Sequence, residues 1–129
     1  MKDILVPISP GELLDKITIL RIKSERIRDA VKLDNVRLEL ELLERTWRDA
    51  CGAADLATDE QALQSVNERL WEIEDRIREK EALRCFDAEF IELARSVYIE
   101  NDERAAVKKR INVALGSRLI EEKSYQQYR

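Results

Sequence analysis

The sequence predicts an all-α fold, an antiparallel four-helix assembly of long amphipathic helices with a short extended N-terminal arm. Only three Gly and two Pro interrupt the 129 residues, and these are the residues that break helices. Hydrophobic residues make up 44% and charged residues 39%. The hydrophobic ones recur at spacings of three, four and seven, which is typical of helices with a buried face. We expect one helical domain over residues 1–129, long enough to build a core without disulfides or metals.

The first expected helix covers residues 9–29 and follows an extended arm at residues 1–8. Ser9 is placed to cap it, Pro10 suits the first helical position, and Glu12 completes an S-x-x-E capping box. Its apolar residues form two ridges, so we expect this helix to be covered on more than one side. The first ridge contains Leu13, Ile17, Leu20, Ile27 and Val31, and the second contains Leu14, Ile19 and Ile22.

A second helix is expected at residues 33–51. Its apolar stripe begins at Val36, about 160° from Leu20 around a straight helix. One uninterrupted helix would point the two stripes at opposite sides, so the sequence requires a break between Arg28 and Asn35. Leu38 and Leu42 form a lesser ridge on this second helix.

Two further helices and a tail are expected at residues 58–84, 87–116 and 117–129. Thr58 and Gln61 form a T-x-x-Q start for the third helix. Asp87 is placed to cap the fourth helix, and Gly116 is a suitable stop.

The residue composition argues against several classes of function. The chain has no His, which removes His-based metal sites and every Ser-His or Cys-His nucleophile pair. Gly-rich phosphate loops and the G-x-S-x-G motif are also missing. We therefore expect no metal and no cofactor, and no catalytic residue can be named. The net charge of −4 opposes general nucleic-acid binding.

The chain is expected to be cytoplasmic and not to bind a membrane. No stretch approaches the ~18 apolar residues of a membrane span, and the apolar run before Pro7 is too short for a signal peptide. Cys51 and Cys85 lack a Cys-x-x-Cys spacing and are interpreted as bystander thiols.

Charge is unevenly distributed along the chain. Residues 104–129 contain seven basic and two acidic residues, whereas the remainder contains 16 basic and 25 acidic ones. One interpretation is that this basic C-terminal region packs against acidic helices of its own chain. The alternative is a site there for an acidic partner or a small anion.

Three polar residues occupy positions where the helical pattern predicts apolar ones. Arg104 lies on the apolar stripe of the fourth helix, and Glu74 lies on that of the third helix with Asn67 nearby. A buried cation needs an anion, so we expect an Arg104–Glu74 ion pair with Asn67 adding a hydrogen bond. The alternatives are a polar pocket for a small anionic ligand, or long side chains that reach solvent.

The sequence resembles a bacterial family of small helical proteins that is defined only as a domain of unknown function. The resemblance rests on segments spread over nearly the whole chain: Ile8–Leu20, Leu70–Asp75, Leu93–Tyr98 with Asn101-Asp102 and Arg104-Ala105, Gly116–Leu119, and Glu121–Tyr125. It implies a helical, cytosolic protein with no established activity. A second resemblance, in architecture and residue type alone, is to the helical chorismate mutases, which bind a dicarboxylate without histidine or metal.

We expect a non-enzymatic interaction module that self-associates, most simply as a homodimer. The predicted ridges hold more apolar surface than one four-helix core can cover, and such surface normally marks an interface. The residues concerned are Leu14, Ile19, Ile22, Leu38 and Leu42. The alternative is a small-anion-binding or chorismate-mutase-like helical enzyme.

Overall fold

The computed structural model describes residues 1–129 and contains four α-helices and no β-strand, which confirms the all-α prediction. None of these helices has an apolar stretch long enough to cross a membrane. The helices are α1 (Pro10–Arg26), α2 (Ala30–Cys51), α3 (Ala57–Ala82) and α4 (Ala88–Ala114).

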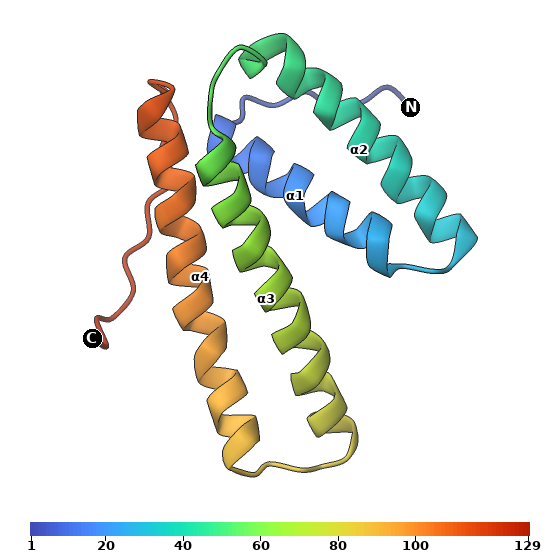
Figure 1. The fold of residues 1–129 in the computed structure, drawn as a ribbon, viewed down its shortest axis with the longest axis vertical. Coiled ribbons are helices and arrows are strands. Elements are labelled where there is room, and N and C mark those ends of the chain that lie inside the picture. Colours follow the sequence, from blue (N-terminus) through green and yellow to red (C-terminus); the bar gives the residue numbers. More distant parts are fainter.

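The four helices form two antiparallel hairpins that meet at an angle (Figure 1). The first hairpin is α1 with α2, and the second is α3 with α4. α1 packs on α2, α3 and α4, whereas the backbone of α2 packs on α1 alone. The far halves of α3 and α4 therefore continue beyond the first hairpin as a pair of helices with no third helix beside them.

The boundary between α1 and α2 lies at residues 27–29. Ile27 adopts an extended conformation (φ −77°, ψ 134°), which ends α1 three residues before the predicted limit of residue 29. Asp29 then caps α2, because its carboxylate accepts a hydrogen bond from the Val31 amide at 3.2 Å. The predicted break therefore exists, but α2 starts at Ala30 and not at residue 33.

The predicted cap of α3 is wrong. Leu56 occupies the N-cap position without a side-chain hydrogen bond, and Thr58 already lies within the first helical turn. α3 ends at Ala82 and not at residue 84, because Arg84 takes a left-handed conformation (φ 54°) and the Cys85 amide donates to the Lys80 carbonyl at 2.9 Å. These are the hydrogen bonds of a Schellman C-terminus.

The Ser9 cap of α1 and the Asp87 cap of α4 are confirmed, but the Glu12 half of the predicted capping box is not, since the Glu12 carboxylate binds Lys108. Ser9 Oγ accepts from the Glu12 amide at 3.2 Å, and Asp87 Oδ1 accepts from the Phe90 amide at 3.0 Å. α4 ends at Ala114, two residues before the predicted limit. Gly116 supplies the left-handed residue (φ 63°) of a second Schellman C-terminus.

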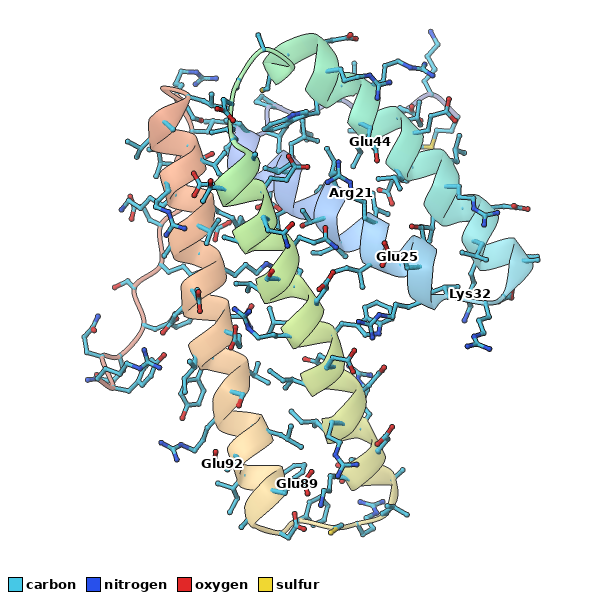
Figure 2. All side chains as sticks on the ribbon, in the orientation of Figure 1. Arg21, Glu25, Lys32, Glu44, Glu89 and Glu92 are labelled. Atoms are coloured by element: carbon cyan, nitrogen blue, oxygen red, sulfur yellow. The ribbon has the colours of Figure 1, made fainter.

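The hydrophobic core lies where α1 crosses the second hairpin. Its centre consists of Leu14 from α1, Leu63 from α3, and Val107 and Ile111 from α4, with Trp47 of α2 packed against it. Arg21 connects three helices nearby, because its guanidinium contacts Glu44 of α2 at 3.6 Å (Figure 2) and Glu60 of α3 at 2.5 Å.

Both apolar ridges of α1 are used within the chain, as the two-ridge pattern predicts. Leu13, Ile17 and Leu20 are buried on one ridge, and Leu14 and Ile22 on the other. The proposed dimer surface is therefore wrong in part. Leu14 and Ile22 are each 1% exposed because α3 and α4 cross α1 at that ridge, and Ile19 is half-buried. Leu38 and Leu42 remain exposed, at 61% and 41%.

Candidate functional site

The start of α1 lies directly on α4. The Gly11 amide donates to Asn112 Oδ1 at 2.7 Å. A Cβ on Gly11 would lie 2.5 Å from the Lys108 carbonyl oxygen and 2.8 Å from Asn112 Oδ1. Only glycine permits this approach, and the approach places the next turn of α1 beside the polar residues of α4.

Asp15 is the centre of a buried polar cluster between α1, α3 and α4. Its side chain is 2% exposed. Arg104 of α4 donates to both carboxylate oxygens, from Nε to Oδ1 at 2.8 Å and from Nη2 to Oδ2 at 2.5 Å. Asn67 of α3 donates to Oδ1 at 3.0 Å and to Thr18 Oγ1 at 2.9 Å. This fork-on-carboxylate geometry is the strongest form of a protein ion pair.

Lys108 forms the second cation of the cluster, one helical turn after Arg104. Its side chain is 9% exposed, and its Nζ lies 2.7 Å from Glu12, 3.1 Å from Glu121 and 4.0 Å from Asp15. Glu12 therefore binds Lys108, in addition to offering its amide to Ser9. Glu121 belongs to the segment after α4, so Lys108 also anchors that segment.

The pKa values in the cluster follow from burial and pairing. Burial by itself would raise the pKa of the Asp15 carboxyl, but hydrogen bonds from Arg104 and Asn67 hold it below its ordinary value. Burial would lower the pKa of Lys108, yet the bond to Glu12 and the charge of Asp15 raise it. The bond from Lys108 lowers the pKa of Glu121. All these groups are therefore charged at neutral pH.

The cluster has no spare positive charge for an anionic ligand. Arg104 and Lys108 face three carboxylates, those of Glu12, Asp15 and Glu121. A second anion would have to displace one of these carboxylates, and removing one partner from a buried pair is costly. No group of three or more Cys, Asp or Glu side chains has an arrangement that suits a metal ion.

The predicted Arg104–Glu74 pair is wrong, although Arg104 does bind a carboxylate, that of Asp15, with two donors on one edge of its guanidinium. Glu74 is half-exposed and pairs with Arg78 on its own helix at 3.3 Å. Asn67 does join Arg104, but through Asp15. The reason is the way the hairpins cross, which brings Asp15 of α1 to Arg104, while Glu74 of α3 pairs with Arg78 on its own helix.

All three predicted site residues line one open groove between α1, α3 and α4. The groove has a volume of about 490 Å³ and is also lined by Trp71, Asn101 and Lys23. Arg104 and Asn67 are held in its wall by their hydrogen bonds to Asp15. Glu74 pairs with Arg78, Arg104 pairs with Asp15, and the remaining charged residues are one cation, Lys23, and one anion, Asp75, so the charges of the groove balance.

Sequence reasoning missed Asp15 and Thr18. The signal was present, because Asp15 lies about 20° from Ile22 around the helix, in the middle of the second apolar ridge of α1. Thr18 lies on the same ridge and is fully buried. A carboxylate at the centre of a buried ridge needs a cation, and Arg104 was the matching anomaly on α4.

The basic C-terminal region contacts acidic residues of the same chain, as the first interpretation expects. Lys108 contacts Glu12 and Glu121. Farther out, Arg110 contacts Asp59 of α3 at 3.3 Å, and Lys109 Nζ lies 3.9 Å from Glu122.

The fold and this cluster define a small all-α protein whose first and last helices are joined by a buried carboxylate with two cations. The chain belongs to the Family of unknown function (DUF6165), whose family model matches residues 4–128. The expected membership in a domain of unknown function is thus confirmed. No curated protein and no solved structure matches the chain.

Proposed function

We propose that the protein is a self-associating helical interaction module, in which two copies pair through the distal hairpin. The distal hairpin is residues 70–96; its α3 turns up to Arg78 border the groove beside α1, and the remainder extends beyond α1 (Figure 1). The observation that supports the proposal is that the distal hairpin has no hydrophobic core. Lys80 is the single buried residue in this segment, and no apolar side chain there is buried.

The distal hairpin is nevertheless rich in large apolar residues. Those on the seam between its two helices are only half-buried, and those at its end are more than half-exposed. An amphipathic helix needs a covering layer on its apolar face, and here two helices cover each other on one side only. The half-buried residues are Leu70, Trp71, Ile73, Ile77, Phe90 and Leu93, and the exposed ones are Leu83, Phe86 and Ile91.

The accessible surface of the chain also supports self-association. The surface is 9224 Å², whereas a compact monomer of this mass has roughly 7,100 Å². The extended arm and tail account for part of this excess of roughly 2,100 Å², and the open distal hairpin for the rest. A standard interface removes roughly 800 Å² from each partner, so the excess is large enough to supply one.

A second copy of the chain is the partner that fits this surface. Two hairpins related by a two-fold axis cover each other with the same apolar residues and complete a four-helix bundle. The competing hypotheses, a small-anion site and a chorismate-mutase-like enzyme, require a free cation at Arg104. They are less well supported because Asp15 already occupies that cation.

Sedimentation velocity at tens of micromolar protein tests the proposal with three matched variants. Ala94 is exposed and lies one turn from Phe90 and Val97 on α4, so Ala94→Arg places a charge in the proposed interface without disturbing the monomer. Ala106→Arg changes an exposed alanine of the same helix outside the distal hairpin. Leu38→Arg probes the exposed ridge on α2, the alternative interface.

We expect the native chain, Ala106→Arg and Leu38→Arg to sediment as dimers. Ala94→Arg should sediment as a monomer with unchanged helix content, because a buried unpaired charge weakens an interface about 30-fold or more. A monomeric native chain would contradict self-association. If Leu38→Arg dissociates the dimer and Ala94→Arg does not, the interface lies on α2 and the distal hairpin is excluded.

A further inference from the structure

The groove between α1, α3 and α4 leaves apolar side chains uncovered. Ile19 of α1 and Leu70 and Trp71 of α3 line it, and each of these residues is only half-buried. Contiguous apolar surface that remains open to solvent normally marks a place where another molecule binds. A small molecule needs most of its own surface enclosed, so an open groove of this kind is better suited to a protruding segment of another chain.

The groove continues into the face of the distal hairpin that carries Ala94. Arg78 of α3 and Asn101 of α4 both line the groove. Ala94 lies seven residues before Asn101, so the two share one side of α4, two turns apart. Trp71 and Arg78 have the same spacing on α3. Because α1 also lines the groove and packs on both helices, it closes this face of the distal hairpin at one end.

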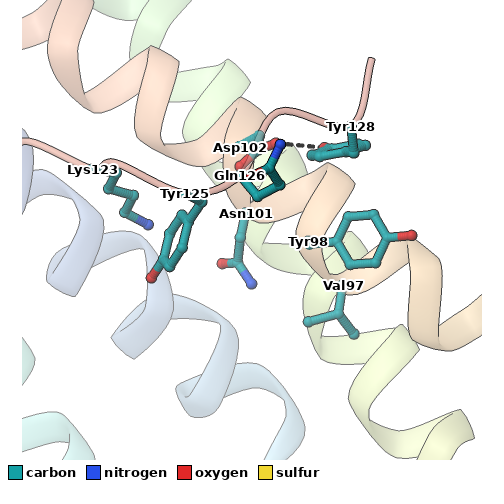
Figure 3. A pocket seen from close by; sticks show the side chains of 8 residues that line it. All are labelled: Val97, Tyr98, Asn101, Asp102, Lys123, Tyr125, Gln126 and Tyr128. Atoms are coloured by element: carbon teal, nitrogen blue, oxygen red, sulfur yellow. Dashed lines mark hydrogen bonds between the residues drawn. The ribbon is translucent and has the colours of Figure 1, made fainter.

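The segment after α4 leaves the distal part of this face uncovered. The Tyr128 hydroxyl donates to the Asp102 carboxylate, and the Tyr128 ring meets Tyr98 edge to face with 4.9 Å between centroids (Figure 3). The segment therefore ends beside Tyr98. Ala94 lies one turn earlier in α4 and is exposed, so the chain itself does not cover it.

A second copy fits this face in one of two possible orientations. A two-fold axis parallel to the helices would put both α1 helices at the same end of the shared face, where they collide. A two-fold axis across the helices makes the two distal hairpins antiparallel and puts the two α1 helices at opposite ends. The tip of each hairpin, defined here as residues 81–86, then approaches the groove of the other copy.

The antiparallel arrangement has a defined register. Trp71 in the groove and Ala82 at the end of α3 are eleven residues apart, or roughly 16 Å along the helix. If Leu83 of one copy meets Trp71 of the other, the two-fold axis lies level with Ile77, midway between these two positions. Ile77 is a half-buried residue on the seam of the hairpin, so the axis crosses apolar surface.

The tip and the groove also match in charge. Lys23 and Asp75 are the charged residues of the groove that form no ion pair within the chain. At the tip, Glu81 and Arg84 have only each other as partners, at 3.9 Å, and both side chains are more than half-exposed. The groove therefore offers one free cation and one free anion, and the tip offers one of each.

We propose that the tip of each distal hairpin docks in the groove of the second copy. Leu83 and Phe86, which are 78% and 53% exposed, would cover the apolar side chains of the groove. The free charges would pair across the interface, with Glu81 bound to Lys23 of the partner subunit. This inference rests on the proposed self-association through the distal hairpin, and it adds which two surfaces meet.

Exchange of these two charges tests the docking, with the dissociation constant of the dimer measured by sedimentation velocity over a dilution series. Glu81→Lys and Lys23→Glu should each weaken the dimer about tenfold, because each variant brings like charges together at both symmetric contacts. An equimolar mixture of the two variants should form a heterodimer about as tight as the native dimer, since each contact then joins a cation to an anion again. Mixing restores only a contact between chains.

Two matched variants control for charge and for exposed apolar surface. Glu92 resembles Glu81 in having an arginine three residues later as its partner, but it lies on the opposite side of α4 from Asn101, about 180° away. Glu92→Lys should therefore leave the dimer unchanged. Leu83→Ser should weaken the dimer about tenfold because it removes an apolar contact. Leu38→Ser, at a leucine of α2 that is 61% exposed, should not.

The results separate this docking from the self-association on which it rests. A monomeric native chain contradicts both. If Ala94→Arg dissociates the dimer but Glu81→Lys and Lys23→Glu do not weaken it, the hairpins pair without docking of the tip, and the inference is overturned. It is also overturned if the mixed variants associate no more tightly than each does alone, or if Glu92→Lys weakens the dimer as much as Glu81→Lys.

Discussion

Replacing Asp15 with asparagine removes one charge from the buried cluster and preserves the shape of the side chain. We expect Asp15→Asn to lower the free energy of unfolding by about 2–4 kcal/mol. Arg104 then loses two hydrogen bonds to a charged acceptor, and such bonds contribute about 1.5–3 kcal/mol each. The loss is smaller than the sum because the Arg104 side chain is 29% exposed and part of its charge returns to water.

Replacing the other partner of this ion pair, Arg104, should lower the free energy of unfolding by more. Arg104→Met strands Asp15, whose side chain is 2% exposed, with Lys108 at 4.0 Å as the nearest remaining cation. Removing one partner of such a pair costs about 3–5 kcal/mol. Glu74→Ala is the matched control. It should change stability by less than about 0.5 kcal/mol, since Glu74 makes a half-exposed pair within one helix.

Urea unfolding followed by circular dichroism measures these differences. All variants need the same protein concentration, because the stability of a self-associating chain depends on it. The reasoning is refuted if Asp15→Asn costs less than about 1 kcal/mol, below the value of a single charged hydrogen bond. It is also refuted if Glu74→Ala is as destabilising as Asp15→Asn.

The native chain and Asp15→Asn should differ in how their free energy of unfolding depends on pH. The folded-state pKa of Asp15 lies below its ordinary value of 3.8. Its stabilising contribution is therefore complete above that value and is lost as the pH falls through the folded-state pKa. The stability difference between native chain and Asp15→Asn should be constant from about pH 7 to about pH 5 and shrink below about pH 4. A difference that persists unchanged at about pH 2 would contradict an ionised Asp15.

Three further predictions concern the backbone and use the same unfolding measurement. Gly11→Ala should destabilise the fold by about 1–3 kcal/mol, because its Cβ would lie 2.5 Å from a backbone carbonyl; a neutral result would mean that α1 can move away from α4. Arg84→Gly should stabilise the fold by about 1 kcal/mol, because Arg84 holds φ 54° and its side chain is largely exposed. Gly116→Ala, at the equivalent position after α4 (φ 63°) with open space around it, should show the opposite sign.

The helices could be predicted from the sequence because apolar spacing depends on the helical period alone. The residues at which the helices begin and end were harder to predict. α2 begins before its apolar stripe because Asp29 caps it. α3 begins at Ala57 with Leu56 in the N-cap position, so Thr58 lies inside the helix and cannot cap it. The residue at which a helix begins depends both on the side chains that can cap it and on the local backbone conformation. The sequence does not reveal which of the two sets the boundary.

One half of the candidate site, the buried cation, could be predicted from the sequence, and its carboxylate partner could not. The position of Arg104 on an apolar stripe reveals a buried cation and its need for a carboxylate, but it does not identify the carboxylate. Periodicity gives the apolar face of each helix and carries no information on the angle between hairpins. That angle places Asp15 of α1 beneath Arg104 and leaves Glu74 outside, and it also uncovers the distal hairpin.

The contacts that close the cluster have a consequence for the order of folding. Asp15 and Arg104 are 89 residues apart in the chain, and Gly11 and Asn112 are 101 apart. Each helical hairpin can form from local contacts, whereas contacts of this separation carry the largest loop-closure cost and form slowly. During synthesis, the part of the second ridge of α1 that packs on α4 and the charge of Asp15 therefore stay uncovered until α4 has emerged. Docking of α1 onto α4 is the expected last step, and a chain stopped before Arg104 has no counter-ion for Asp15.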